Sequence, residues 1–119
     1  MALDDILSAY DRAWNTTGDE LRALLEKSLT DDCELIEPRG RFIGRDAIIE
    51  RITGFGERFP GATSCVTTNA DEHNGFARYD WEIRGADGSL ILDGMDFVER
   101  ARDGRLRRVV MFFGHLNSA

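Results

Sequence analysis

Two carboxylic acids and one tyrosine lie in apolar surroundings in this sequence and could converge in one pocket. Glu37 ends a short strand-like stretch, Asp96 lies mid-strand between Met95 and Phe97, and Tyr10 falls on the apolar side of a helical pattern. A buried carboxyl group tends to keep its proton, whereas one near water tends to lose it. Two carboxyl groups in unlike surroundings could therefore divide the acid and base roles of a proton transfer.

Large aromatic side chains could line a pocket for a flat, apolar ligand. The candidates for ligand contact are Trp14, Phe55, Phe59, Trp81 and Phe113. The same residues would serve equally well as core, because periodicity does not show which side of a sheet each strand residue takes. The expected partner is a small apolar ligand, with packing alone as the alternative.

The first half of the chain carries three helical patterns and one short strand. Apolar residues at helical spacing predict helices over residues 3–15, from a cap at Asp19 to about residue 29, and from Asp46 to a stop at Pro60-Gly61. Residues 33–37 read as a strand stopped by Pro38. Residues 40–44, which begin and end with glycine, read as a connector.

The second half alternates in the manner of β-strands, over residues 63–69, 76–84, 89–98 and 106–113. The turn pairs Asn74-Gly75, Asp87-Gly88 and Asp103-Gly104 tolerate the positive φ of tight hairpins, which predicts an antiparallel meander. Helices that precede a sheet favour the α+β class and one domain over residues 1–119. A curled sheet closed by helices has a mouth where a small-molecule pocket can form.

Composition excludes several function classes. A formal net charge of −7 argues against a nucleic-acid partner. No apolar run approaches the roughly 20 residues of a membrane span, and the acidic start differs from a signal peptide, so we expect a cytoplasmic protein without membrane contact. Cys33 and Cys65 are expected as buried, reduced thiols, and no ligand spacing suggests a metal or another cofactor.

Several short motifs then carry a family resemblance. They span residues 10–15, 18–19, 30–32, 37–40, 42–48, 94–97 and 103–104, and include Glu37-Pro38-Arg39-Gly40 and Gly94-Met95-Asp96-Phe97. In order and spacing they resemble the nuclear transport factor 2-like superfamily, of the SnoaL-like or polyketide-cyclase-like group, over essentially the whole chain. The resemblance implies a cone-shaped fold with three N-terminal helices on a curved antiparallel or mixed sheet. It leaves function open among isomerases, cyclases, epoxide hydrolases, dehydratases and non-catalytic binding domains.

Within that superfamily, the three polar residues resemble the site of ketosteroid isomerase. The resemblance implies that Glu37 moves a proton, while Tyr10 and a protonated Asp96 hold the oxyanion, which makes these three the candidate catalytic residues. Glutamate at position 37 is one methylene longer than the aspartate of that enzyme, and Arg39 places a cation beside it. Tyr10 matches if one residue is inserted before Gly18.

The site residues of two related branches of the superfamily match this sequence only in part. Arg78 and Asp80 resemble the Arg-x-Asp pair of the epoxide-hydrolase branch, but no second aspartate lies near residues 112–114. The cyclase branch pairs an aspartate with a histidine on the preceding strand, whereas His73 and His115 lie elsewhere.

We therefore expect a small-molecule-binding domain that could act as an isomerase-like enzyme, transferring a proton on an apolar carbonyl compound without a cofactor. The alternative is a non-catalytic ligand-binding domain or a dimeric interaction domain. An open interior would favour the enzyme and a filled one the interaction domain. If Asp96 faces inward, Met95 and Phe97 face outward on an uncovered sheet face, which predicts a homodimer.

Overall fold

The computed structural model describes residues 2–119 and contains three helices and seven strands. The elements are α1 (Leu3–Ala13), α2 (Gly18–Ser28), β1 (Leu29–Glu37), β2 (Gly40–Ile43), α3 (Arg45–Arg58), β3 (Thr63–Val66), β4 (Asp71–His73), β5 (Phe76–Arg84), β6 (Leu90–Arg100) and β7 (Leu106–Phe113). The helices come before most of the sheet, and the predicted α+β class is confirmed.

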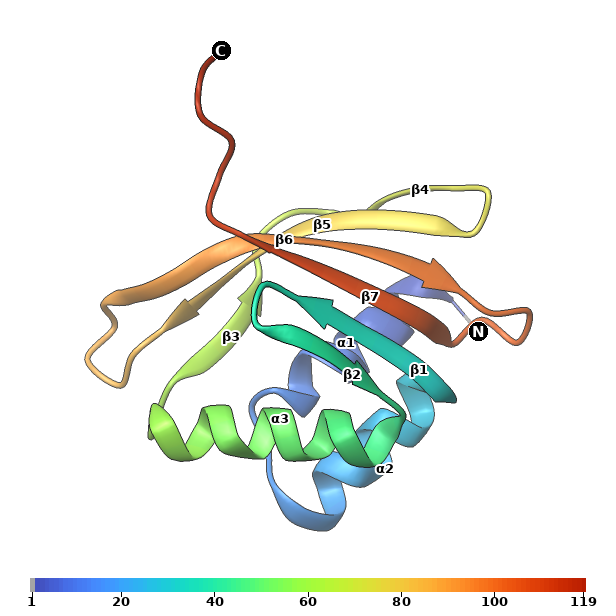
Figure 1. Cartoon of the computed structure of the whole chain (residues 1–119), viewed down its shortest axis with the longest axis horizontal. Helices are drawn as coiled ribbons and strands as arrows, with labels where there is room; N and C mark the ends of the chain where they lie inside the picture. Colours follow the sequence, from blue (N-terminus) through green and yellow to red (C-terminus); the bar gives the residue numbers. More distant parts are fainter. Residues whose placement is uncertain (1) are drawn as a thin grey trace.

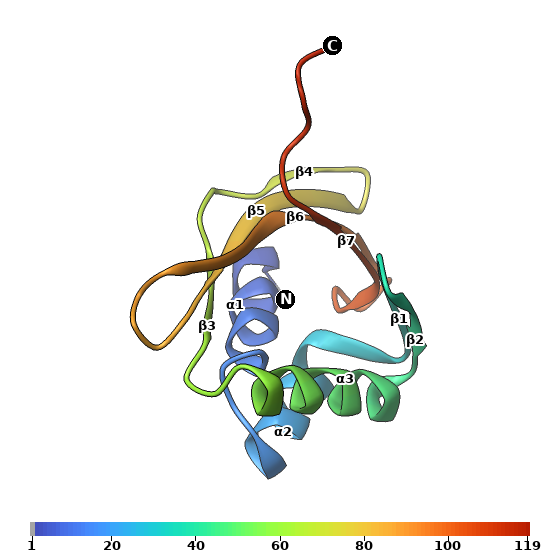
Figure 2. The ribbon, with the colours of Figure 1, turned by 60° about the vertical axis from the view of Figure 1, so that its left-hand side comes forward.

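The strands form one mixed sheet in the order β2-β1-β7-β6-β5-β3, with β4 also paired to β5. Strands β5, β6 and β7 are antiparallel neighbours, as the hairpin sequences predict, and β1 runs parallel to β7. Asn74 and Gly75 both have positive φ, 53° and 82°, as a two-residue hairpin turn requires. The sheet curls, and the helices lie on its concave side (Figures 1 and 2).

The core fills the space between the helices and the concave face of the sheet. Helix α1 buries the apolar stripe that its sequence predicts, and Ile6 and Ala13 are fully enclosed. Leu35 of β1 and Val98 of β6 meet this stripe from the sheet side and are equally buried. Burial of one helix face against one sheet face is what joins the two layers.

Several predicted boundaries are wrong. Residues 40–43 form strand β2 because Phe42 pairs with Leu35 of β1, a tertiary contact that local propensity does not report. Strand β4 has no counterpart in the sequence-based prediction, and the strand predicted over residues 63–69 ends at Val66. Helix α2 begins at Gly18 after Thr17, so Asp19 lies in its first turn and does not cap it. Cys33 is buried as predicted, but the prediction of a buried Cys65 is wrong, because this residue is exposed on the edge strand β3.

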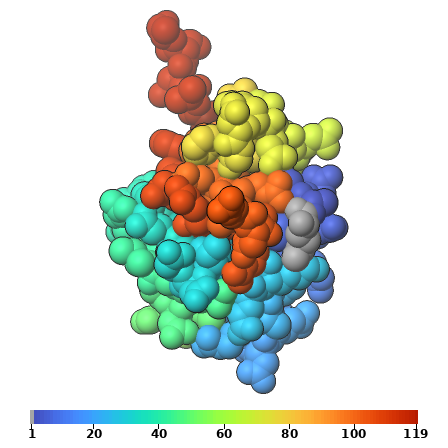
Figure 3. Space-filling view, turned by 90° about the vertical axis from the view of Figure 1, so that its right-hand side faces the viewer, coloured from blue at the N-terminus to red at the C-terminus, as the bar shows by residue number. Residues whose placement is uncertain are grey.

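The two faces of β6 differ as expected. Asp96 points to the concave side, while Met95 and Phe97 lie on the convex side, which no helix covers (Figure 1). The chain after Phe113 stands away from the body of the molecule (Figure 3). None of the helices within residues 2–119 has the length and apolar character needed to cross a bilayer.

Candidate functional site

The candidate site is built around Asp96 in the middle of β6. Cross-strand register places Tyr79 of β5 on one side of Asp96 and Met111 of β7 on the other. All three lie on the concave face, and Asp96 is only 3% exposed. A carboxyl group so far from water is costly unless hydrogen bonds compensate it.

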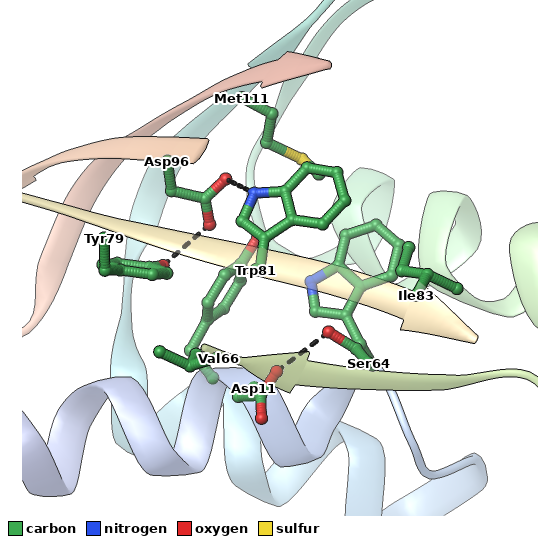
Figure 4. Close-up of a pocket in the computed structure, with 10 residues that line it drawn as sticks. Asp11, Ser64, Val66, Tyr79, Trp81, Ile83, Asp96 and Met111 are labelled. Atoms are coloured by element: carbon green, nitrogen blue, oxygen red, sulfur yellow. Dashed lines mark hydrogen bonds between the residues drawn. The ribbon is translucent and has the colours of Figure 1, made fainter. Parts of the chain in front are cut away.

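Two neighbours on β5 supply those hydrogen bonds. The Tyr79 hydroxyl donates to Oδ2 of Asp96 at 2.7 Å, and the Trp81 indole N–H donates to Oδ1 at 2.8 Å (Figure 4). Gly94 permits the second bond, because a Cβ at this position would lie 2.7 Å from the Trp81 ring and 2.1 Å from the Phe112 carbonyl oxygen. Both carboxyl oxygens of Asp96 are therefore engaged.

The surroundings of Asp96 bring its two protonation states close in energy at neutral pH. Burial raises the pKa of Asp96 to about 7, against the opposing effect of the Tyr79 and Trp81 donors. The negative charge of Asp11 adds a smaller upward contribution to that pKa. An acid with a pKa near the working pH can both give and take a proton.

Beside Asp96 lies a cavity of about 20 Å³, enough for one water molecule. Its lining residues are Tyr10, Asp11, Trp14, Ser64, Val66, Tyr79, Trp81, Ile83, Asp96 and Met111. The Tyr10 hydroxyl is buried and has no hydrogen-bond partner within residues 2–119. Burial, followed by the charge of Asp96, raises the pKa of Tyr10, against a lowering effect of the nearby Trp14 side chain, which lies outside hydrogen-bonding geometry. The hydroxyl therefore remains a donor. A ligand larger than water requires the lining side chains to move. The interior is therefore nearly filled, which is the state expected of the interaction domain, and the open interior expected of an enzyme is not observed in the part of the chain that the structure describes.

The outer wall of the cavity ties α1 to the edge strand β3. The Ser64 hydroxyl donates to Asp11 Oδ1 at 2.9 Å. The Asn15 side chain donates to the Ser64 carbonyl at 2.9 Å and accepts from the Ser64 N–H at 2.7 Å, as a neighbouring strand would. Burial raises the pKa of Asp11, although its bond from Ser64 opposes this.

Glu37, the third candidate catalytic residue, does not line this cavity. It ends β1 on the concave side, and its side chain is 1% exposed. Nη2 of Arg51, on α3, lies 3.5 Å from its Oε2, and neither carboxylate oxygen accepts a hydrogen bond in the described part of the chain. The expected neighbour Arg39 is exposed, so the cation beside Glu37 comes from the helix.

The predicted aromatic set divides into two groups. Trp14 and Trp81 line the cavity. Phe55 packs edge-on against Trp14 with ring centroids 5.8 Å apart, and Phe59 follows at 5.1 Å from Phe55. Phe113 contacts Trp81 at 6.0 Å. These three phenylalanines support the cavity walls from behind and do not line the cavity.

The epoxide-hydrolase alternative is wrong for this chain. Arg78 faces the convex side, where it forms an ion pair with Asp71 at 3.1 Å, so the Arg-x-Asp pair points away from the cavity. His115 pairs with Asp93 at the C-terminal end of β7, also outside the cavity. Within residues 2–119, no three side chains of the metal-ligating types lie close enough together to hold an ion.

Sequence reasoning missed three polar residues of the interior: Tyr79, Asp11 and Arg51. Tyr79 alternates with Trp81 on one strand face, but only the β5–β6 register shows that both meet Asp96. The inward position of Arg51 could have been predicted from the sequence, because Arg51 lies four residues before Phe55 within the apolar stripe of α3. A charged residue inside such a stripe points into the core and needs a partner there.

Comparisons with known proteins agree with this architecture. The family model for the SnoaL-like domain matches residues 7–109. A SnoaL-like protein of Agrobacterium tumefaciens str. C58, provisionally assigned as an isomerase, is 27% identical, with a TM-score of 0.84 over 92% of this chain and 95% of that one. No curated protein sequence matches significantly.

Two more distant structures share the fold. An NTF2-like protein of unknown function from Exiguobacterium sp. 255-15 is 16% identical, with a TM-score of 0.74 over 93% of this chain and 99% of that one. A protein from Jannaschia sp. CCS1, provisionally assigned as a SnoaL-like polyketide cyclase, is also 16% identical, with a TM-score of 0.75 over 93% of this chain and 83% of that one. At these identities the likeness concerns the fold alone.

Proposed function

The chain belongs to the SnoaL-like domain family, and from this premise we propose that its cone binds a small carbonyl compound and moves a proton on it. The observation that carries the proposal is the buried Tyr10 hydroxyl, which lines the Asp96 cavity and lacks a hydrogen-bond partner within residues 2–119. A buried hydroxyl of this kind is costly in a purely structural core. A ligand oxygen would satisfy it, in place of the single water molecule for which the cavity has room.

Asp96 supplies the second donor when it carries a proton. In the neutral acid, one oxygen still accepts from Trp81, while the other becomes a donor. The Tyr79 hydroxyl can then rotate away, and the acid can donate to a ligand oxygen beside Tyr10. Two such donors in a dry site favour an oxygen that gains negative charge, as in an enolate.

Glu37 is the proposed base. It takes a proton from the carbon next to the carbonyl group, the C–H electron pair forms the enolate, and Tyr10 and Asp96 hold the resulting oxyanion. Return of the proton to another carbon completes an isomerisation without an external reactant. For this step the ligand must reach past Met111, which lies between Glu37 and Asp96 in the sheet. The flexible thioether of methionine suits a wall that must move.

Binding of phenols of rising acidity, measured by calorimetry, tests the proposal, since a phenolate mimics an enolate. The wild-type protein should bind more acidic phenols more tightly. Tyr10→Phe and Asp96→Ala should each weaken binding by about 1.5–3 kcal/mol, the loss of a hydrogen bond to a charged oxygen. Glu37→Gln should retain phenol binding but abolish exchange of ligand α-protons with deuterated water. If neither Tyr10→Phe nor Asp96→Ala weakens binding, Asp96 is a structural residue of its strand.

The convex face of the sheet favours a second function, that of a homodimeric interaction domain. Phe97 of β6 and Phe112 of β7 lie diagonally across these two strands, 38% and 56% exposed, and Phe76 stacks on Phe97 at 5.5 Å. Met95 and Val110 complete this apolar surface. Arg108, Glu99 and Glu34 form an ion-pair network across β7, β6 and β1, so the surface combines an apolar centre with a charged border.

Sedimentation at micromolar concentration tests the dimer. The protein should sediment at about twice its chain mass of 13.4 kDa. Phe112→Asp should give a monomer by placing a charge in the apolar centre. Leu90→Asp, at a residue 49% exposed near the start of β6, is the matched control and should remain dimeric. A monomeric wild-type protein would remove this function and leave the ligand-binding one intact.

A further inference from the structure

The ion pair between Glu37 and Arg51 leaves much of its hydrogen-bonding capacity unused. The Glu37 side chain is almost wholly buried, yet neither of its oxygens accepts a hydrogen bond from residues 2–119. The nearest guanidinium nitrogen lies 3.5 Å away, longer than the roughly 2.7–2.9 Å that is usual for a charged hydrogen bond. A pair made only for stability would be expected to close this gap.

The Arg51 guanidinium has a defined position but uses few of its N–H donors. Its side chain is 17% exposed, and its guanidinium lies 5.9 Å from the centre of the Phe42 ring. A guanidinium carries five N–H donors in a planar fork that matches a carboxylate. Within the described residues, its ion-pair and cation–π partners are one Glu37 oxygen and the Phe42 ring, so most of its N–H donors remain for another oxyanion.

Strand register relates this pair to the Asp96 cavity. Ile36 of β1 pairs with Val110 of β7, so the next residues, Glu37 and Met111, are neighbours on the concave face. Met111 pairs in turn with Asp96. Two strand spacings, about 9.5 Å, therefore separate the backbones at Glu37 and Asp96, and Met111 lies between them. Because side chains at both ends project from the concave face, a single six-membered ring with two opposite substituents can bridge a backbone separation of this size.

We propose that Arg51 is an oxyanion-binding residue for the ligand, and that the ligand is a one-ring compound with a carboxylate opposite its carbonyl or phenolic oxygen. The inference rests on the proposed function. The ring takes the place of the Met111 side chain, its oxygen meets Tyr10 and Asp96, and its carboxylate occupies the free donors of Arg51. Glu37 then lies beside the ring, between the two ends of the ligand.

Binding of three probes tests the inference: phenol, 4-hydroxybenzoate and 4-hydroxybenzamide. The two benzoic derivatives have nearly the same shape and differ in charge. The wild-type protein should bind 4-hydroxybenzoate roughly ten- to a hundredfold more tightly than the amide, the effect of a charged hydrogen-bonded pair. Glu37→Gln should increase this ratio, because it removes the anion that competes for Arg51.

The double variant Glu37→Gln/Arg51→Gln removes both charges and avoids leaving either one buried alone. It should bind phenol as the wild type does and show no preference for the carboxylate. Arg58→Gln is the matched control, since Arg58 also lies on α3 and over a phenylalanine ring, at 5.6 Å, but is exposed. It should keep the wild-type ratio.

The outcomes separate the two claims. If phenol binds but the carboxylate preference is absent, or survives in the double variant, the inference is overturned and the proposed function stands. If phenol itself does not bind, both fail.

Discussion

Replacing Asp96 with asparagine should make the stability of the protein less dependent on pH. Burial raises the pKa of Asp96 from its ordinary value of 3.8 to about 7 in the folded protein. An acid whose pKa is raised on folding stabilises the fold fully below its unfolded pKa, and this contribution is lost as the pH rises through its folded pKa. The wild-type protein should therefore lose stability from this residue between about pH 4 and pH 7.

The size of the loss follows from the shift. A separation of about three pH units corresponds to on the order of 4 kcal/mol, because each unit is worth about 1.36 kcal/mol. An asparagine side chain imitates the neutral acid, since its oxygen can accept from Trp81 and its amide can donate to the Tyr79 hydroxyl. Asp96→Asn should thus match the wild type near pH 4 and become progressively more stable than it towards pH 7.

The assay is urea unfolding at half-unit steps from about pH 4 to pH 8, with the difference in free energy of unfolding plotted for each variant. Asp80→Asn is the matched control, because Asp80 lies on the neighbouring strand opposite Met95 and faces the convex side. Its difference from wild type should stay nearly flat. A flat difference for Asp96→Asn as well, or one that falls as the pH rises, would refute the reasoning that burial dominates at Asp96.

Two further predictions concern packing and thiol access. Gly94→Ala should lower the free energy of unfolding in urea by about 1–3 kcal/mol and alter the Trp81 fluorescence, because its Cβ would meet the Phe112 backbone and the indole ring. The control Gly54→Ala, in open space on α3, should raise the free energy of unfolding by about 0.5–1 kcal/mol. A Gly94→Ala variant as stable as the wild type would contradict the close approach. A thiol reagent at about pH 8 should modify the exposed Cys65 rapidly in the folded protein and leave Cys33 unmodified until the protein unfolds. The reason is that Cys33 is buried and burial raises the pKa of its thiol to about 12. Equal modification rates for the two thiols would contradict this prediction.

Much of the fold could be predicted from periodicity, because the helices and long strands each bury one face. Ile6, Tyr10 and Ala13 recur at helical spacing, and the turn Asn74-Gly75 carries its own conformational signal. Strand β2 has four residues and depends on its pairing with β1, so no local pattern identifies it. Family resemblance then supplied the cone shape that these elements share.

The candidate site was less predictable, because its contacts cross between elements. The inward orientation of Asp96 could be inferred from its apolar neighbours on β6, and the structure agrees. Its donors could not, because cross-strand register decides that Tyr79 and Trp81 meet it. For Glu37, the sequence predicts Arg39 as the neighbouring cation. In the structure that cation is Arg51, which lies on a helix fourteen positions further along the chain.

The most direct test of the central claim is an NMR titration of the Asp96 carboxyl carbon, with and without a bound phenol. The free protein should give a pKa of about 7 for Asp96. A bound phenolate should raise that pKa further, because a second negative charge in the same dry cavity disfavours ionisation. An Asp96 that titrates near its ordinary pKa of 3.8, and whose pKa phenol leaves unchanged, would contradict the account.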